Sequence, residues 1–216
     1  MVQYIPLKNA GSGGIREILA NLRTVSGTCF FIDLYRSTAI KYHVPAAEWI
    51  ARFHNTFSFI SFLNDFPDNI VKGIGDEIML FIPDEDLAKK TAYDTHFALL
   101  EEIRATVYNI RHFPVQEKFL NCKVAIHHCT ETYNISFFRG ANDFYGKEID
   151  LTARLMTKTA ENRIVLSESF YKKVLEDLAQ AGLPPDSGCL AEVSGAFSEQ
   201  FRGIPYPVEY RYIDVE

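Results

Sequence analysis

The sequence has no apolar run near the roughly 18 residues that a membrane-spanning helix requires. Its first residues, MVQYIPLKNAGSGGIREIL, lack the basic start and apolar stretch of a secretory signal peptide. These absences argue against a membrane partner and against export. We therefore expect a cytoplasmic protein.

The chain has only four cysteines, and no two of them have CxxC spacing. Cys29 and Cys122 stand within apolar, strand-like runs, where buried free thiols are common. This pattern favours a reduced protein without structural disulfides.

Positive charge is also scarce. The net charge is −6 and the pI is near 5.6, which argues against nucleic acid as the main partner. Nucleotides are still possible ligands, because bound metal ions can supply the positive charge that phosphates require.

What the chain does contain is a regular succession of apolar segments. We expect an N-terminal segment over residues 1–20 and one domain over 21–216. The predicted elements are a strand at 27–35, a helix at 45–66, a hairpin at 69–83, a helix at 84–113, strands at 119–129 and 133–140, a loop at 140–147, a helix at 147–160, a strand at 163–167, a helix at 168–182 and a last strand within 203–215. Pro205 and Pro207 predict an edge position for that last strand. The order predicts an α+β fold with a ferredoxin-like βαββαβ core and an extra C-terminal helix and strands.

Two acidic residues stand at the ends of apolar strands in this pattern. Asp33 closes the strand 27–35, and Asp76 lies at the turn of the hairpin. In a ferredoxin-like sheet these strands are neighbours, so the two carboxylates can approach and hold Mg²⁺ or Mn²⁺ on oxygen ligands. Taken singly, each is also explained as a strand-end or turn acid.

Four sequence blocks resemble the catalytic domain of class III nucleotidyl cyclases. They are CFFIDLYRSTAI, VKGIGDEIMLFI, CKVAIHH and DFYGKEIDLTARLMTKTAENRIVLSESFY, in that order within residues 27–171. The resemblance implies the homodimeric class III cyclase fold. It also implies conversion of a ribonucleoside triphosphate to a 3′,5′-cyclic nucleotide and pyrophosphate, with two divalent cations, Mn²⁺ or Mg²⁺.

The resemblance further assigns roles to single residues. Asp33, Asp76 and the backbone carbonyl of Leu34 would bind the metals. Lys72 and Asp143 match the pair that reads the base in adenylate-forming members, and Arg154 matches the arginine that stabilises charge on the α-phosphate. The active sites would be shared across a homodimer.

Several positions depart from the family pattern. Asp150 replaces the usual ribose-orienting Asn, and Arg202 and Ile204 lie near the position of a phosphate-binding Lys. Arg202 or Arg139 could take the place of that Lys. These changes leave open an inactive cyclase-homology domain that binds nucleotide and regulates a partner.

A bulky pair, Tyr35 and Arg36, replaces the small residues that usually follow the first metal-binding acid. If either projects into the nucleoside pocket, it occupies space that a purine needs and can hydrogen-bond a pyrimidine carbonyl. We therefore expect cyclic CMP or cyclic UMP as the product, with cyclic AMP as the alternative that Lys72 and Asp143 favour. The resemblance extends to stand-alone pyrimidine cyclases of bacterial antiphage defence, whose product a separate effector reads.

Two other apparent motifs do not indicate a binding site. His127 and His128 are adjacent on a predicted strand and so point to opposite faces, which argues against a shared metal. Gly73 and Gly75 lack the Gly-Lys-Ser/Thr ending of a phosphate-binding Walker loop. A ferredoxin-like interaction domain without nucleotide is the least favoured interpretation.

Overall fold

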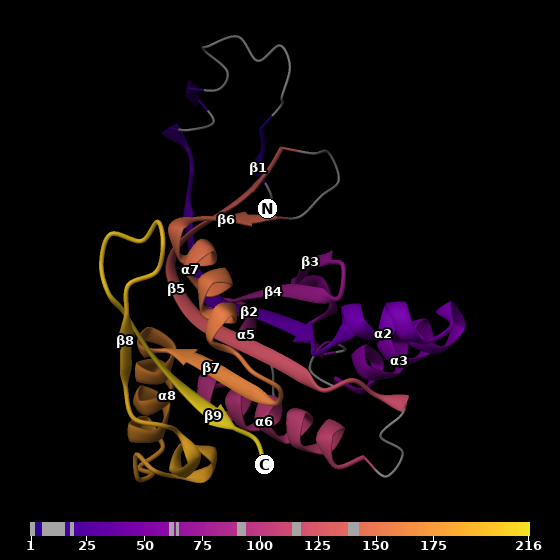
Figure 1. Ribbon diagram of the computed structural model, residues 1–216. Helices are drawn as coiled ribbons and strands as arrows, with labels where there is room; N and C mark the ends of the chain where they lie inside the picture. Colours follow the sequence, from indigo (N-terminus) through magenta and orange to yellow (C-terminus); the bar gives the residue numbers. More distant parts are fainter. Residues whose placement is uncertain are drawn as a thin grey trace.

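A nine-stranded sheet organises the chain in the computed structural model, which describes residues 3–5, 16–17, 20–60, 63, 65–89, 94–113, 118–137 and 143–216. The order along the sheet is β3-β4-β2-β5-β7-β9-β8, and β1 and β6 also pair with β5 (Figure 1). The strands are β1 (Gln3–Tyr4), β2 (Thr24–Leu34), β3 (Ile70–Ile74), β4 (Glu77–Pro83), β5 (Cys122–Ser136), β6 (Phe144–Tyr145), β7 (Arg163–Ser167), β8 (Phe197–Glu199) and β9 (Val208–Asp214). The predicted α+β fold, with the first strand beside the hairpin, is confirmed.

Helices lie on both faces of this sheet. They are α2 (Ser37–His43), α3 (Ala46–Phe59), α5 (Asp84–Leu87), α6 (His96–Arg111), α7 (Lys147–Leu155) and α8 (Glu168–Gln180), with the short 3₁₀ turns η1 (Pro67–Asn69), η3 (Met156–Lys158) and η4 (Gly188–Glu192). In Figure 1, α6 and α8 lie below the sheet and α7 lies above it. Within the described residues, no helix is both long enough and apolar enough to cross a membrane.

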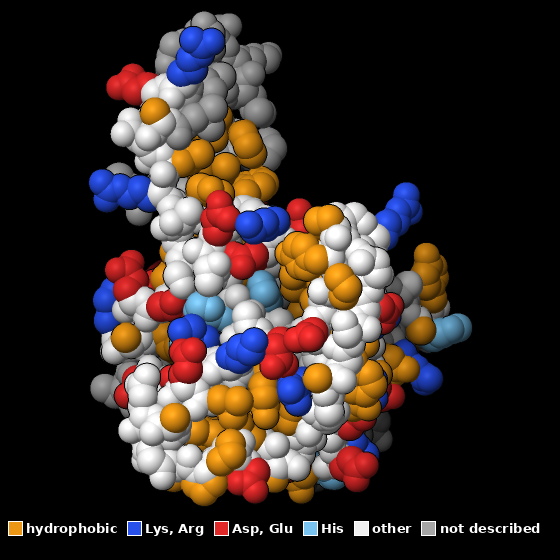
Figure 2. All heavy atoms as spheres, turned by 90° about the vertical axis from the view of Figure 1, so that its left-hand side faces the viewer, with side chains coloured by type: hydrophobic (Ala, Val, Ile, Leu, Met, Phe, Trp, Pro, Cys, Tyr) orange, Lys and Arg blue, Asp and Glu red, His pale blue; other side chains and the backbone are white. Residues whose placement is uncertain are grey.

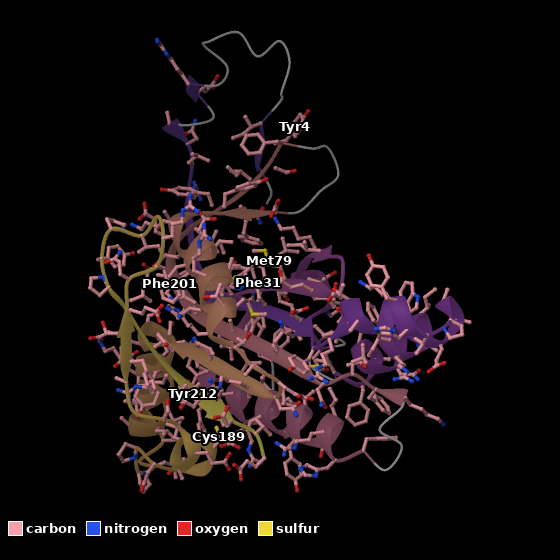
Figure 3. The ribbon with its side chains drawn as sticks, viewed as in Figure 1. Tyr4, Phe31, Met79, Cys189, Phe201 and Tyr212 are labelled. Atoms are coloured by element: carbon pink, nitrogen blue, oxygen red, sulfur yellow. The ribbon has the colours of Figure 1, made fainter. Side chains whose placement is uncertain are left out.

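Side chains along the central strands point alternately to the two faces of the sheet, and this divides the core into two layers. Phe30, Ile32 and Leu34 of β2 pack with the side chains of α3, α6 and α8. Phe31 and the facing Met79 of β4 pack with Ile149 of α7 instead, and Figure 3 shows both beside that helix. This period of two is what a sheet covered on both faces requires.

The predicted helix over 84–113 is wrong, because two helices occupy this range. The short α5 ends at Leu87, and α6 begins only at His96. Thr95 sets the new start: its side-chain oxygen accepts a hydrogen bond from the Ala98 amide at 3.1 Å, which caps the first turn.

Three further predictions differ from the structure: the end of one helix, the division of one strand and the position of the last strand in the sheet. The helix predicted over 45–66 ends at Phe59, because Ile60 is extended. The strands predicted at 119–129 and 133–140 are one long strand, β5, whose polar second half pairs with β1 and β6. The last strand is not at the edge: β9 lies between β7 and β8, and the two prolines precede it, so they interrupt none of its ladder bonds.

The cysteines occupy the interior. All four are free and buried, which agrees with the expectation of no structural disulfide. Burial raises the pKa of Cys29 and of Cys122 to about 12.

Candidate active site

Two acidic side chains meet at one end of the central strands. Asp33 is the next-to-last residue of β2, opposite Glu77 of β4 on one side and Lys123 of β5 on the other. Asp76 occupies the tight turn between β3 and β4, where Gly75 has a φ of 70° that favours glycine. The Leu34 amide donates to the backbone carbonyl of Asp76 at 3.3 Å and fixes the turn against β2.

Each carboxylate has its own cationic or polar partner. Lys123 forms an ion pair with Asp33. The hydroxyl of Ser37, the first residue of α2, donates to Asp76, and the Lys41 ammonium group lies 3.2 Å from the other carboxylate oxygen. Ser37 and Lys41 are one helical turn apart, so α2 places both on the same acid.

The two acids differ in proton affinity. Burial raises the pKa of Asp33, and the neighbouring Asp76 adds to the increase, although Lys123 opposes it. Burial also acts to raise the pKa of Asp76, but hydrogen bonds from Ser37 and Lys41 outweigh it and lower that pKa. The carboxylates are thus close enough to influence each other, and such a pair is stabilised by cations.

This arrangement fits divalent cations. Two half-buried carboxylates share one end of the sheet, and oxygen donors are what Mg²⁺ and Mn²⁺ prefer. Sequence reasoning found both acids but missed Lys123, Lys41 and Ser37. The signals were the helical spacing from Ser37 to Lys41 directly after Asp33, and a lone lysine within the apolar run CKVAI.

A second predicted pair is in contact. The Lys72 ammonium nitrogen lies 2.9 Å and 3.1 Å from the two carboxylate oxygens of Asp143, although 71 positions separate these residues. The same nitrogen is 5.8 Å from the centre of the Tyr145 ring. Lys72 belongs to β3, whereas Asp143 directly precedes β6 and Tyr145 lies in it. The ion pair therefore links β3 to the start of β6.

Asp150 and Arg154 lie on the exposed side of α7. They are four positions apart, a spacing that permits a helical ion pair, but both side chains are exposed and they form no such pair. Among the described residues none forms an ion pair with the Arg154 guanidinium. The Arg154 guanidinium is therefore exposed to solvent.

Tyr35 and Arg36 belong to a separate pocket of about 210 Å³. It also contains Ile40 of α2, Arg52 of α3, Asn121 and Glu161, and the Tyr35 amide donates to the Asn121 carbonyl at 2.7 Å. No contact within the described part of the chain joins Tyr35 or Arg36 to Lys72 or Asp143. Arg202 is exposed in the loop between β8 and β9, and Arg139 lies outside the described residues.

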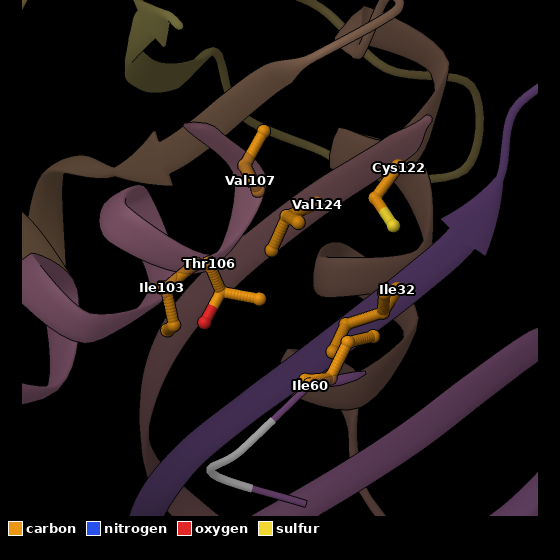
Figure 4. A pocket seen from close by; sticks show the side chains of 7 residues that line it. All are labelled: Ile32, Ile60, Ile103, Thr106, Val107, Cys122 and Val124. Carbon is orange, nitrogen blue, oxygen red and sulfur yellow. The ribbon is translucent and has the colours of Figure 1, made fainter. Parts of the chain in front are cut away.

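The small cavity between the sheet and α6 is no ligand site. Its volume is about 10 Å³, and Figure 4 shows it lined mostly by apolar side chains, including Ile32, Ile103 and Val124. That is about the space of one water molecule and offers it too few polar partners.

Comparison of the whole fold with solved structures gives consistent neighbours. The adenylyl cyclase CyaB from P. aeruginosa aligns with a TM-score of 0.68 at 17% identity, covering 89% of this chain and 95% of that chain. The guanylyl cyclase Cya2 aligns with a TM-score of 0.67 at 17% identity, covering 88% of this chain and 94% of that chain. The non-canonical dimeric guanylyl cyclase domain of the RhoGC fusion protein from Blastocladiella emersonii aligns at 0.58 and 11% identity, covering 88% and 96%. No family model and no curated protein sequence matches the chain. At these identities the likeness establishes a shared fold.

Proposed function

We propose that this chain, which has the fold of class III nucleotidyl cyclase catalytic domains, is itself a nucleotidyl cyclase. It would close a ribonucleoside triphosphate to a 3′,5′-cyclic nucleotide and release pyrophosphate. The observation that carries the proposal is the meeting of Asp33 and Asp76 at the end of β2 and the β3–β4 turn.

In this proposal Asp33, Asp76 and the Leu34 carbonyl hold two divalent cations, Mn²⁺ or Mg²⁺. Bound cations of this kind lower the pKa of the attacking 3′-hydroxyl and neutralise triphosphate charge. Lys41 and Lys123 already lie on the two acids and can move to phosphate oxygens when a metal occupies the carboxylates. They would supply cationic charge to the phosphates beside the acid pair.

Arg154 would stabilise charge on the α-phosphate, and Asp150 would orient the ribose. Their exposure on α7 supports an active site completed by a second copy of the chain, because neither has an ion-pair partner in its own described surroundings. A preorganised arginine at developing charge contributes several kcal/mol in sites of this kind.

For the base we propose a pyrimidine, with adenine as the alternative. The pocket that contains Tyr35 and Arg36 supports the pyrimidine, because the hydroxyl of one and the guanidinium of the other can donate hydrogen bonds to a base carbonyl. The formed Lys72–Asp143 pair favours adenine. A signalling role in antiphage defence, with a separate effector, stays a prediction from the family resemblance.

The direct test is incubation with Mn²⁺ and each of the four ribonucleoside triphosphates, with products identified by mass. A cyclic product is expected, and its absence with all four substrates would refute the cyclase proposal and leave the inactive homologue.

The acid pair is tested by Asp76→Ala, which we expect to abolish turnover because the cation site is lost. Asp68→Ala is the matched control, since that acid is exposed in η1 near the same hairpin. Substantial activity in a folded Asp76→Ala variant would contradict the assignment.

The base is tested by comparing Tyr35→Ala with Lys72→Ala over the same substrates. If the Tyr35 pocket reads the base, only Tyr35→Ala relaxes a pyrimidine preference towards purines. A change confined to Lys72→Ala would place base recognition at Lys72 and Asp143.

A further inference from the structure

A second group of potential metal ligands lies apart from the acid pair. Asp84 begins α5, His96 is the first residue of α6, and His128 lies in β5. One ligand atom from each side chain lies within 4.8 Å of the others. The His128 Nε2 atom is 3.1 Å from Asp84 Oδ1, and the His96 Nε2 atom is 3.7 Å from the same oxygen.

The surrounding contacts orient both His96 and Asp84 towards a common point. The His96 Nδ1 atom lies 3.3 Å from a carboxylate oxygen of Asp177 in α8. Because an ionised carboxylate only accepts, Nδ1 carries the proton, and Nε2 is directed to Asp84. The Ser26 hydroxyl donates to Asp84 Oδ2 at 2.5 Å, and His128 Nε2 lies 3.1 Å from Oδ1 and 3.2 Å from Oδ2, so the Asp84 carboxylate faces both Ser26 and His128.

One atom of the group has an unmet requirement. His96 Nε2 is buried and has no hydrogen-bond partner among the described residues. A buried polar atom without a partner is costly, and a metal ion would satisfy it.

We propose that Asp84, His96 and His128 form a Zn²⁺ site with one coordination position left for water. Tetrahedral zinc with bonds of about 2.0–2.1 Å holds its ligand atoms roughly 3.3 Å apart. The two distances to Asp84 Oδ1, 3.1 Å and 3.7 Å, lie on either side of that value. Two imidazoles and a carboxylate favour zinc, whereas the oxygen donors of Asp33 and Asp76 favour Mg²⁺ or Mn²⁺.

The position of the site gives it a structural role. In the pairing of β2 with β5, Asp33 is opposite Lys123 and Thr28 is opposite His128. Five residues of strand separate these pairs, which corresponds to about 17 Å. The ion would connect α5, α6 and β5, with Asp177 of α8 behind His96.

Access from solvent is open on one side. The Asp84 side chain is 40% exposed, while those of His96 and His128 are 12% and 3% exposed. Figure 2 shows histidine side chains reaching the surface among acidic and basic ones on one face of the molecule. A metal ion can therefore enter over Asp84 without unfolding of the chain.

The test is a titration of the chelator-treated protein with Co²⁺, which substitutes for Zn²⁺ and absorbs visible light strongly in tetrahedral sites. We expect a strong band that saturates at one equivalent and disappears when Zn²⁺ is added. Asp33→Asn should keep this band, which separates the site from the acid pair. The outcome is therefore independent of cyclase activity.

The assignment of ligands is tested by His96→Gln and His128→Gln, which should lose the band. His54→Gln, at an exposed histidine of α3, is the matched control and should retain it. If the buried variants fail to fold, Asp84→Asn gives the same test at a more exposed ligand. Absence of a band in the wild-type protein, or its survival in all three ligand variants, would overturn the proposal in favour of a metal-free hydrogen-bond network.

Thermal unfolding provides an independent readout. A ligand that binds only the native state stabilises it in proportion to the logarithm of the free concentration in excess of Kd. Zn²⁺ should therefore raise the unfolding midpoint of the wild-type and His54→Gln proteins and leave that of Asp84→Asn unchanged. An equal increase in all three would contradict the site.

Discussion

Lys123 lies at the acid pair in the structure, although the sequence did not predict it there. Its ammonium group pairs with Asp33, although nothing in its motif marks it as more than a strand lysine. If it binds phosphate during turnover, Lys123→Gln should raise the KM for the triphosphate by at least about tenfold, since a charge-assisted hydrogen bond contributes roughly 1.5–3 kcal/mol. Steady-state kinetics at saturating Mn²⁺ would measure this.

Lys172→Gln is the control for this variant, because Lys172 is an exposed lysine of α8. An unchanged KM in Lys123→Gln would show that the lysine only balances the charge of Asp33 in the absence of substrate.

We predict that the buried thiols of the folded protein react slowly with alkylating reagents. Burial raises the pKa of Cys29 and Cys122 to about 12, so their reactive thiolate forms are rare at pH 7. The population of thiolate increases only as the pH rises towards that value. Labelling by iodoacetamide between pH 7 and pH 9 should be far slower for the folded protein than for the urea-unfolded chain. Rapid labelling of either cysteine in the folded protein at pH 7 would contradict this expectation.

At the scale of elements, Gly27 permits the close approach of β2 and β4. A Cβ atom there would lie 2.4 Å from the Ile82 carbonyl oxygen and 2.8 Å from the Pro83 Cα atom, both of which are backbone. Gly27→Ala should therefore lower the free energy of unfolding by about 2 kcal/mol, as overpacking does. Urea unfolding would measure the change.

Gly195→Ala is the matched control, because nothing lies within 4 Å of a Cβ atom at that position. Its effect should stay within about 0.5 kcal/mol. Equal stability of the two variants would mean that the strands separate at little cost.

The sequence predicted the central elements better than the peripheral ones, for a physical reason. Apolar periodicity located β2 and the β3–β4 hairpin, because β2 is paired on both sides and β2 and β4 are buried along most of their length. It missed the break before α6, which depends on the Thr95 cap, and the place of β9, which depends on pairing with the short strand β8. Likewise Asp33 and Asp76 were predictable from local motifs, whereas the partners Lys123 and Lys41 required the tertiary pairing of β5 and α2 with the acids.

At the scale of the whole molecule, the exposed face of α7 predicts shared active sites. If one copy supplies Asp76 and another supplies Arg154, each single variant, Asp76→Ala or Arg154→Ala, should be inactive alone. In an isologous dimer, mixing them creates one intact site in each mixed pair. Equal mixing should therefore restore about a quarter of the wild-type sites, as measured by product formation.

Mixed dimers can be isolated with two different affinity tags before the assay. No recovery in such isolated pairs would contradict sites shared between copies.

The long strand β5 has a consequence for the fidelity of folding. It carries Lys123 at one end and His128 further along, and it pairs with β2 through a register shift between Val25 and Gly27. Side chains alternate, so a slip by one residue would turn Lys123 away from Asp33 and His128 away from Asp84 together. An irregularity of this kind favours one register over its neighbours. A chain that pairs β5 wrongly would thus lose both sites at once, and metal binding would distinguish correctly folded molecules from misfolded ones.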